Sequence, residues 1–257
     1  MVYKLKNDNP IHVFDWYFSD VSERDGARYH ALADRPSEAR QLMSLINADS
    51  IIHFALWSNL PERHPIRDLW SESNTDLLAT IYLAYGGYYR QAFTALRSWF
   101  EIVIHGMYFA DHCGQQNERY EQWRRGLRNA PVNMNSITAS LASRTTSCGT
   151  HITRETILSK LDSVYSFLSL HAHGRGLDKF DLQNGRDNVP RYLPKSFDLW
   201  VKNMFVTVDT AYFLYSTFYL YEIRNYLRDS RPELERAIKL SRNIGSVLPH
   251  YVLIVCG

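Results

Sequence analysis

The stretch 88–113 constrains the fold of this chain more than any other, because it has the pattern of one long and largely buried helix. Its apolar side chains recur at steps of three and four residues: Phe93, Leu96, Phe100, Val103, Ile104 and Met107. A polar stripe crosses this apolar face. Arg97, Glu101 and His105, here called the central stripe, follow one another at four-residue steps and therefore stack along one side. Charged and polar groups on a buried helix need partners, so the central stripe is the first candidate functional site.

The rest of the chain predicts further helices. The alternation typical of strands is scarce, and helical patterns recur over about 37–59, 74–85, 115–129, 153–173, 195–228 and 232–245, with one short helix inside 130–152. We therefore predict an all-α fold, a helical bundle in which helices cover one another's apolar faces. A single domain of 257 residues is expected, with an irregular N-terminal arm (1–35), the bundle (36–245) and an apolar C-terminal tail (246–257).

Charge and cysteine content narrow the class of protein. With 29 basic and 27 acidic side chains the net charge is +2, so the charge of the whole chain does not argue for nucleic acid. Cys113, Cys148 and Cys256 are scattered and form no CxxC pair, and the first ten residues lack an apolar signal core, which favours the reducing cytoplasm. Residues 204–221 are long enough to consider as a membrane span, but Asp209 and many hydroxyl groups favour a buried helix.

A second candidate site lies where the helix over 153–173 ends. The sequence LSLHAHGRG places His171, His173 and Arg175 close together there, just before a polar, turn-rich connector over 174–196. On a helical wheel His171 falls among apolar residues and is the inward histidine. Two interpretations stay open: the histidines interact with the negative end of the helix dipole, or one of them pairs with the central stripe. HxH supplies two ligands and zinc takes three or four, so no metal site is expected.

A local excess of positive charge follows the central helix. Residues 119–154 contain six arginines and one glutamate, with aromatic residues interleaved. Such a surface attracts a phosphate backbone, and an aromatic ring beside it can stack on a base. The candidates for nucleic-acid contact are Arg119, Trp123, Arg124, Arg125 and Arg128. A solvated arginine-rich face is the other interpretation of the same residues.

Several enzyme signatures do not occur in the sequence. GxSxG, GxxxxGK[ST] and GxGxxG are all missing, so serine-hydrolase, P-loop and dinucleotide-binding functions are not indicated. The sequence consequently predicts no cofactor.

Two segments together resemble a known family. The helix YRQAFTALRSWFE over 89–101, which follows a Gly–Tyr turn, and the segment YSFLSLHAH over 165–173 resemble the HEPN-like helical proteins. The likeness is to a bacterial branch with an LR..E helix and a later LS...H motif, and it covers about residues 75–175. By that match Arg97 and Glu101 are the helix pair and His173 is the histidine, whereas periodicity points to His171. Both histidines stay candidates.

HEPN proteins are helical bundles, commonly dimers, and many are metal-independent ribonucleases of toxin–antitoxin, abortive-infection and CRISPR-linked defence systems. The resemblance implies an RNA-directed toxin or phage-defence effector, working as a homodimer or in a protein complex. In that case His171 or His173 acts as general acid or base, Arg97 with Arg175 stabilises charge on the phosphate, and Glu101 orients one of them. The chain departs from the usual family signature, an arginine four to six residues before a histidine on a late helix.

Two non-catalytic functions compete with the ribonuclease. In one, the chain is a helical interaction subunit, the central stripe is a structural ion pair, and the aromatic surface or the tail 246–257 binds a partner protein. In the other, the chain is the nucleic-acid-binding subunit of a larger complex and uses its arginines without cleavage.

Overall fold

A computed structural model describes residues 52–62, 64–110, 118–126, 133–144, 153–172 and 192–229, together with residues 33, 35, 38, 42 and 49. The described residues form helices and turns without a strand, which confirms the all-α prediction. Apart from residues 33 and 35, the N-terminal arm lies outside the described residues, as do the helix expected over 232–245 and the tail 246–257.

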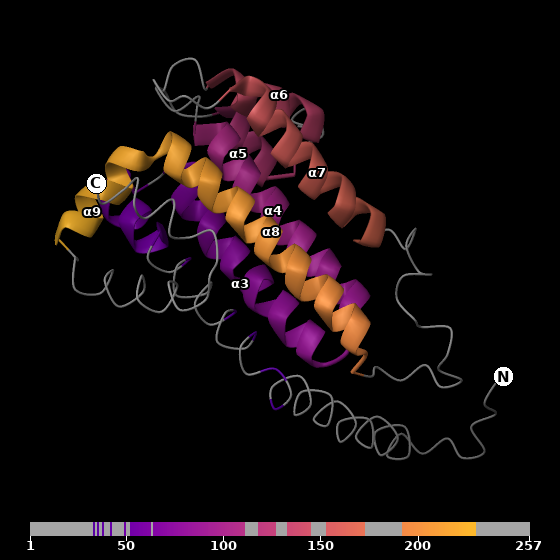
Figure 1. Cartoon of the computed structure of the whole chain (residues 1–257). Coiled ribbons are helices and arrows are strands. Elements are labelled where there is room, and N and C mark those ends of the chain that lie inside the picture. Colours follow the sequence, from indigo (N-terminus) through magenta and orange to yellow (C-terminus); the bar gives the residue numbers. More distant parts are fainter. Residues whose placement is uncertain are drawn as a thin grey trace, which may run out of the picture.

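The helices of the described residues are labelled in Figure 1, and residues 52–59 are helical as well. The labelled helices are α3 (Pro65–Tyr85), α4 (Tyr89–Ala110), α5 (Glu118–Arg124), α6 (Met134–Ser143), α7 (Arg154–Ala172), α8 (Pro194–Phe218) and α9 (Leu220–Asp229). α4 is the predicted central helix, and α5, α6 and α7 confirm the helices expected within 115–129, 130–152 and 153–173.

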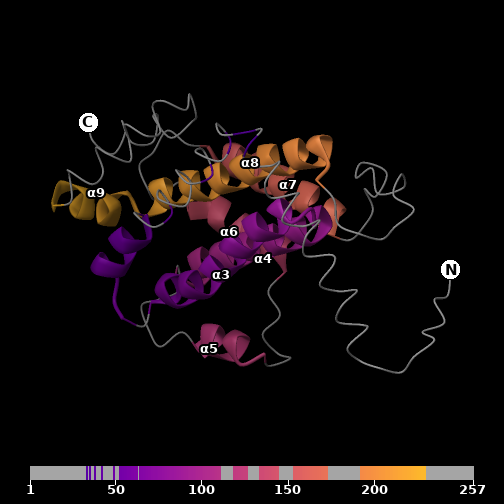
Figure 2. The ribbon, with the colours of Figure 1, turned by 90° about the horizontal axis from the view of Figure 1, so that it is seen from below.

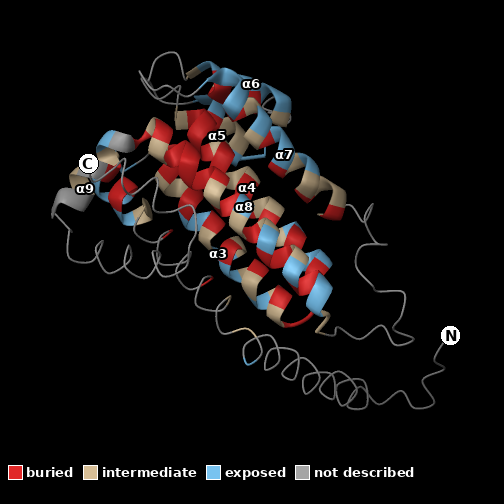
Figure 3. Ribbon diagram, in the orientation of Figure 1, coloured by how far each residue is buried: buried red, intermediate tan, exposed pale blue. Residues whose placement is uncertain are grey.

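α4 packs against α3, α7 and α8, and α6 contacts α4 as well (Figures 1 and 2). Figure 2 shows α5 on the side of α3 and α4 that faces away from α8. Buried residues concentrate on the inner helices, while α6 and α7 expose their outer sides (Figure 3). The predicted apolar face of α4 is confirmed, since each of its members is at most 2% exposed: Phe93, Leu96, Phe100, Val103, Ile104 and Met107.

The contacts along α4 give the direction of its neighbours. α3 precedes it through a tight turn at Gly86 and Gly87, and Gly87 has a φ of 79°, a conformation that favours glycine. α7 runs antiparallel to α4, because His171 near the end of α7 packs on Phe93 near the start of α4. α8 runs parallel to α4, because the two helices meet at their starts, where the backbone N–H of Leu193 donates to Tyr89 Oη at 3.0 Å.

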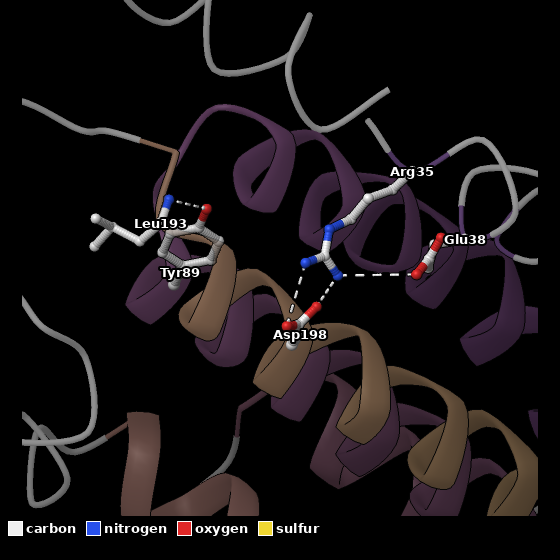
Figure 4. Close-up of polar contacts among 5 residues, drawn as sticks. All are labelled: Arg35, Glu38, Tyr89, Leu193 and Asp198. Atoms are coloured by element: carbon white, nitrogen blue, oxygen red, sulfur yellow. Dashed lines mark hydrogen bonds and ion pairs between the residues drawn. The ribbon is translucent and has the colours of Figure 1, made fainter. Parts of the chain in front are cut away.

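Two side-chain contacts fix the start of α8, as Figure 4 shows. The Tyr89 hydroxyl satisfies the Leu193 N–H, which matters because the first N–H groups of a helix have no partner within it. Arg35 forms an ion pair with Asp198 in the second turn of α8 and lies 3.8 Å from Glu38, measured from Nη1 to Oε1. Residues from two other parts of the chain, Arg35 and Tyr89, therefore hold this helix end in place.

At the other end of α8, the side chain of Arg144 contacts both α4 and α8. Its Nη1 donates to the Met107 carbonyl in the last turn of α4 at 3.2 Å, where the helix dipole favours a cation. Its guanidinium carbon lies 4.3 Å from the ring centroid of Phe218 and 5.6 Å from that of Tyr219. The ends of α4, α6 and α8 thus meet at one arginine.

Two predicted helix bounds were wrong, and both errors have a physical reason. The helix predicted over 74–85 begins earlier, since α3 starts at Pro65, because proline suits the first helical position and His64 Nδ1 accepts from the Ile66 N–H at 3.3 Å. The single helix expected over 195–228 is interrupted at Tyr219, whose backbone leaves the helical conformation and whose ring is buried beside His64 and Arg144. None of the described helices is long and apolar enough to span a membrane.

A relay of two hydrogen bonds ties α3, α4 and α8 together inside the core. Trp200 Nε1 donates to Thr80 Oγ1 at 3.0 Å, and this hydroxyl donates to the Ala92 carbonyl at 2.7 Å. Thr80 and Trp200 are both 0% exposed. Because a hydroxyl both donates and accepts, Thr80 satisfies an indole N–H that would otherwise be buried without a partner.

Thr80→Val keeps the shape of the side chain and removes the hydroxyl. We expect the free energy of unfolding to fall by about 2 kcal/mol, because Trp200 Nε1 loses its acceptor in the core. Urea unfolding followed by circular dichroism measures the change. The matched control is Thr94→Val on the exposed side of α4, where Oγ1 donates to the Arg90 carbonyl, and its expected cost is below about 0.5 kcal/mol. Equal losses in the two variants would contradict the role given to the relay.

Candidate functional site

Arg97 and Glu101 of the central stripe form an ion pair on the partly exposed side of α4. Arg97 Nε donates to Glu101 Oε1 at 2.7 Å, and the side chains are 18% and 30% exposed. Arg97 Nη2 also donates to Tyr165 Oη at 3.0 Å, so the pair is fastened to α7. Burial opposes the positive charge, but Glu101 and Tyr165 outweigh it and raise the pKa of Arg97. The guanidinium is therefore charged, oriented and within reach of solvent.

His105, the third member of the central stripe, faces α5. Its Nδ1 lies 2.6 Å from the Glu101 carbonyl oxygen, and because a carbonyl only accepts, Nδ1 carries the proton and Nε2 is the acceptor of the neutral ring. The ring stacks on Trp123, with centroids 4.9 Å apart and planes at 21°. Burial lowers the pKa of His105, with the Glu101 carbonyl and carboxylate acting against it, so the neutral ring is favoured at pH 7.

His171 points inward, as periodicity predicted, and is 0% exposed. Its ring stacks on Phe167, with centroids 4.0 Å apart, and lies 4.9 Å from the Phe93 ring. Its Nδ1 is 2.8 Å from the Phe167 carbonyl oxygen, so this nitrogen also carries the proton in the neutral ring. A side chain with no exposed surface does not touch a ligand in this arrangement, and its visible role is to pack the end of α7 against the start of α4.

Three candidate residues fall outside the described part of the chain: His173, Arg175 and Arg128. α7 ends at Ala172, one residue before His173. Most of the connector expected over 174–196 is also outside the described residues, which resume at Tyr192.

Arg119 and Arg124 of α5, and Arg125 directly after it, are exposed, and two of them lie close to acidic side chains. Arg124 lies 3.4 Å from Glu121 and 3.8 Å from Asp68, and Arg125 lies 3.9 Å from Glu121. The Arg119 guanidinium carbon is 5.7 Å from the ring centroid of Tyr108. The positive potential of α5 is thus partly balanced at its own surface.

Trp123 attaches α5 to the bundle. His105 covers one face of its ring, and the Phe109 ring lies beside it with centroids 5.2 Å apart. Next to it, Tyr120 is 3% exposed and donates its hydroxyl to Asp68 Oδ2 of α3 at 3.2 Å. An aromatic cluster therefore holds this seven-residue helix in place.

Sequence reasoning missed two partners in this region. Tyr165 contacts Arg97 and lies 68 residues away from it in the sequence. The sequence feature that could have indicated this partner is a tyrosine among apolar residues on the inward side of α7. Asp68 receives both Tyr120 and Arg124, and no pattern in the sequence joins these three. Among the described residues, no group of three or more histidine, cysteine, aspartate or glutamate side chains is placed to hold a metal ion.

A scan against protein-family models, a search of curated proteins and a search of solved structures each returned no match to this chain.

Trp123→Ala removes the ring that covers His105. We expect the pKa of His105 to rise toward 6.5, because burial is the main cause of its lowering. An NMR titration of the imidazole Cε1–H signal measures the shift. Trp57→Ala is the control, since Trp57 is 44% exposed on the separate helical stretch 52–59. If the titration midpoint of His105 in Trp123→Ala equals that of the wild type, burial under Trp123 of α5 is not the cause of the lowered pKa.

Proposed function

We propose that this chain is a HEPN-like, RNA-directed protein and that it acts as a metal-independent ribonuclease of the toxin or phage-defence kind. Arg97 is the residue that corresponds in sequence to the arginine of the LR..E motif. The observation that carries the proposal is how the side chain of Arg97 is held. Its guanidinium is partly exposed and is held by a carboxylate at 2.7 Å and a phenol at 3.0 Å. A cation oriented before the substrate arrives can stabilise charge that develops on a phosphate.

The proposed roles follow from which side chains a substrate can reach. Arg97 binds the scissile phosphate, while Glu101 and Tyr165 position the guanidinium and keep it charged. His171 is enclosed by aromatic rings, so we assign it to packing. The acid–base role then goes to His173, the histidine that the family resemblance selects, with Arg175 beside it in sequence as a second cation.

The test is cleavage of RNA by the full chain in the presence of EDTA. We expect Arg97→Ala and His173→Ala to lower the rate about a hundredfold or more, since each removes a group that acts in the transition state. Arg90→Ala is the matched control, because Arg90 is exposed on the first turn of the same helix. Cleavage that survives Arg97→Ala, or that EDTA abolishes, contradicts the proposal.

A second candidate function, the non-catalytic interaction subunit, is favoured by the burial of His171 and by the bonds that engage Arg97. In that case Arg97, held by Glu101 on the same helix, fixes the position of α7 on α4 through its bond to Tyr165. Wild-type protein without any RNA cleavage, combined with a lower melting temperature for Arg97→Ala than for Arg90→Ala, supports this function over the ribonuclease.

Binding of nucleic acid without cleavage is tested by its salt dependence. If these arginines bind a phosphate backbone, the triple variant Arg124→Ala, Arg125→Ala, Arg128→Ala lowers the slope of log K against log salt by about 2 for single-stranded RNA. Fluorescence anisotropy with a labelled oligonucleotide measures both slopes. A slope equal to that of the wild type would show that these arginines do not contact phosphates.

A further inference from the structure

The hydroxyl group of Tyr165 has a hydrogen-bonding capacity that the contacts within the protein use only in part. Its oxygen accepts from Arg97 Nη2 at 3.0 Å. A phenol also carries one proton that it can donate, and no acceptor for this proton occurs among the described residues. Tyr165 is partly exposed. Its hydroxyl can therefore donate to a group that arrives from solvent.

Two other phenols that make hydrogen bonds near α4 differ from Tyr165 in this respect. Tyr120 is 3% exposed and donates its proton to Asp68 Oδ2 at 3.2 Å, which joins α5 to α3. Tyr89 accepts from the Leu193 N–H at 3.0 Å and is 2% exposed, so solvent does not reach it. Of these three phenols, only Tyr165 combines an unused proton with an accessible surface.

A phenol is not the strongest holder of a guanidinium that this position could carry. A carboxylate would add an ion pair, and Glu101 already makes one with Arg97 Nε at 2.7 Å. An ionised carboxylate accepts hydrogen bonds and has none to donate, whereas a phenol accepts one and donates another. What tyrosine contributes here, beyond fastening α7 to α4, is therefore a donor.

Tyr165 and Arg97 form two neighbouring donors where α7 lies against α4. Tyr165 Oη and Arg97 Nη2 are 3.0 Å apart, and the guanidinium carbon is 5.2 Å from the centroid of the Tyr165 ring. Adjacent donors at this spacing can bind two oxygens of one phosphate. Because Glu101 offsets part of the positive charge of Arg97, a second donor without negative charge strengthens the binding of an anion.

We propose that Tyr165 is a second substrate-binding residue, whose hydroxyl donates to one oxygen of a backbone phosphodiester while Arg97 binds the other. This inference rests on the proposed function, in which Arg97 binds the scissile phosphate. It adds that Tyr165 contacts the substrate itself, beyond holding the arginine. The ligand is a phosphate diester, which carries one negative charge, and dimethyl phosphate is a small probe of that chemistry.

Fluorinated tyrosines in place of Tyr165 test this contact in the full chain, since fluorine makes a phenol a stronger donor and a weaker acceptor. These residues keep the shape of the side chain, so folding is preserved. The ¹⁹F NMR signals of 3-fluorotyrosine and 3,5-difluorotyrosine at position 165 report the binding of dimethyl phosphate, at a pH that keeps both phenols protonated. We expect the difluorinated protein to bind it about twofold more tightly.

Two controls accompany this titration. Arg97→Ala in the labelled protein should weaken the binding of dimethyl phosphate at least about tenfold, because a hydrogen bond to a charged group is lost. A fluorotyrosine in place of Tyr221, which is 73% exposed on α9, should show no response to dimethyl phosphate. If Tyr165 only holds Arg97, fluorine weakens the acceptor and the difluorinated protein binds less tightly. That order, or no response at position 165, would overturn the inference.

RNA cleavage in EDTA separates this inference from the proposed function. Tyr165→Phe should lower kcat/KM at least about tenfold, whereas Tyr221→Phe should leave it unchanged. Cleavage that is lost in Arg97→Ala but kept in Tyr165→Phe removes the role of Tyr165 and leaves the ribonuclease standing. A wild type that binds dimethyl phosphate in the expected order without cleaving RNA supports the contact and contradicts the ribonuclease.

Discussion

The enclosure of α4 by α3, α7 and α8 is the constraint on which the rest of this structure depends. A helix covered on several sides must satisfy its polar groups within the protein, and each neighbour of α4 supplies part of what is needed. Thr80 on α3 donates to a carbonyl of α4 and accepts from Trp200 of α8. Tyr165 on α7 accepts from Arg97, and Arg144 at the end of α6 donates to the last turn. The polar contacts thus specify which helix lies against which side of α4.

The surroundings of the central stripe differ from one end of α4 to the other. Its three side chains therefore differ in the chemistry that they can perform. Arg97 is paired and oriented toward α7, with part of its side chain in solvent. Glu101 uses its carboxylate for Arg97 and its carbonyl for His105. His105 lies under Trp123 and has a fixed tautomer. The stripe looks uniform in the sequence, but its side chains lie in two different environments. One is charged and lies beside α7, and the other is aromatic and lies beside α5.

Periodicity was enough to predict the buried side of α4 and the inward position of His171, because both depend on residues of one helix. It failed where the outcome depends on distant residues. The start of α3 required knowing that His64 accepts from Ile66, and the break at Tyr219 depends on packing against His64 and Arg144. The Arg97–Tyr165 contact spans 68 residues, a separation that no local pattern encodes. The family resemblance, the single-domain division and the roles of His173 and Arg175 stay predictions.

The fastening of α8 has a consequence for how this protein can move. Tyr89 and Arg35 hold its first turns, Trp200 is bonded to Thr80 farther along, and Arg144 covers its last residue. Sliding α8 along the rest of the bundle by one helical turn would break all of these contacts at once, so such shear is strongly disfavoured. The break at Tyr219 is held as well, because its ring is buried beside His64 and Arg144, and Asn59 Nδ2 donates to the Glu222 carbonyl of α9 at 3.2 Å. The first turn of α9 is therefore anchored to the same bundle, and Ile223 beyond the break is buried in its core.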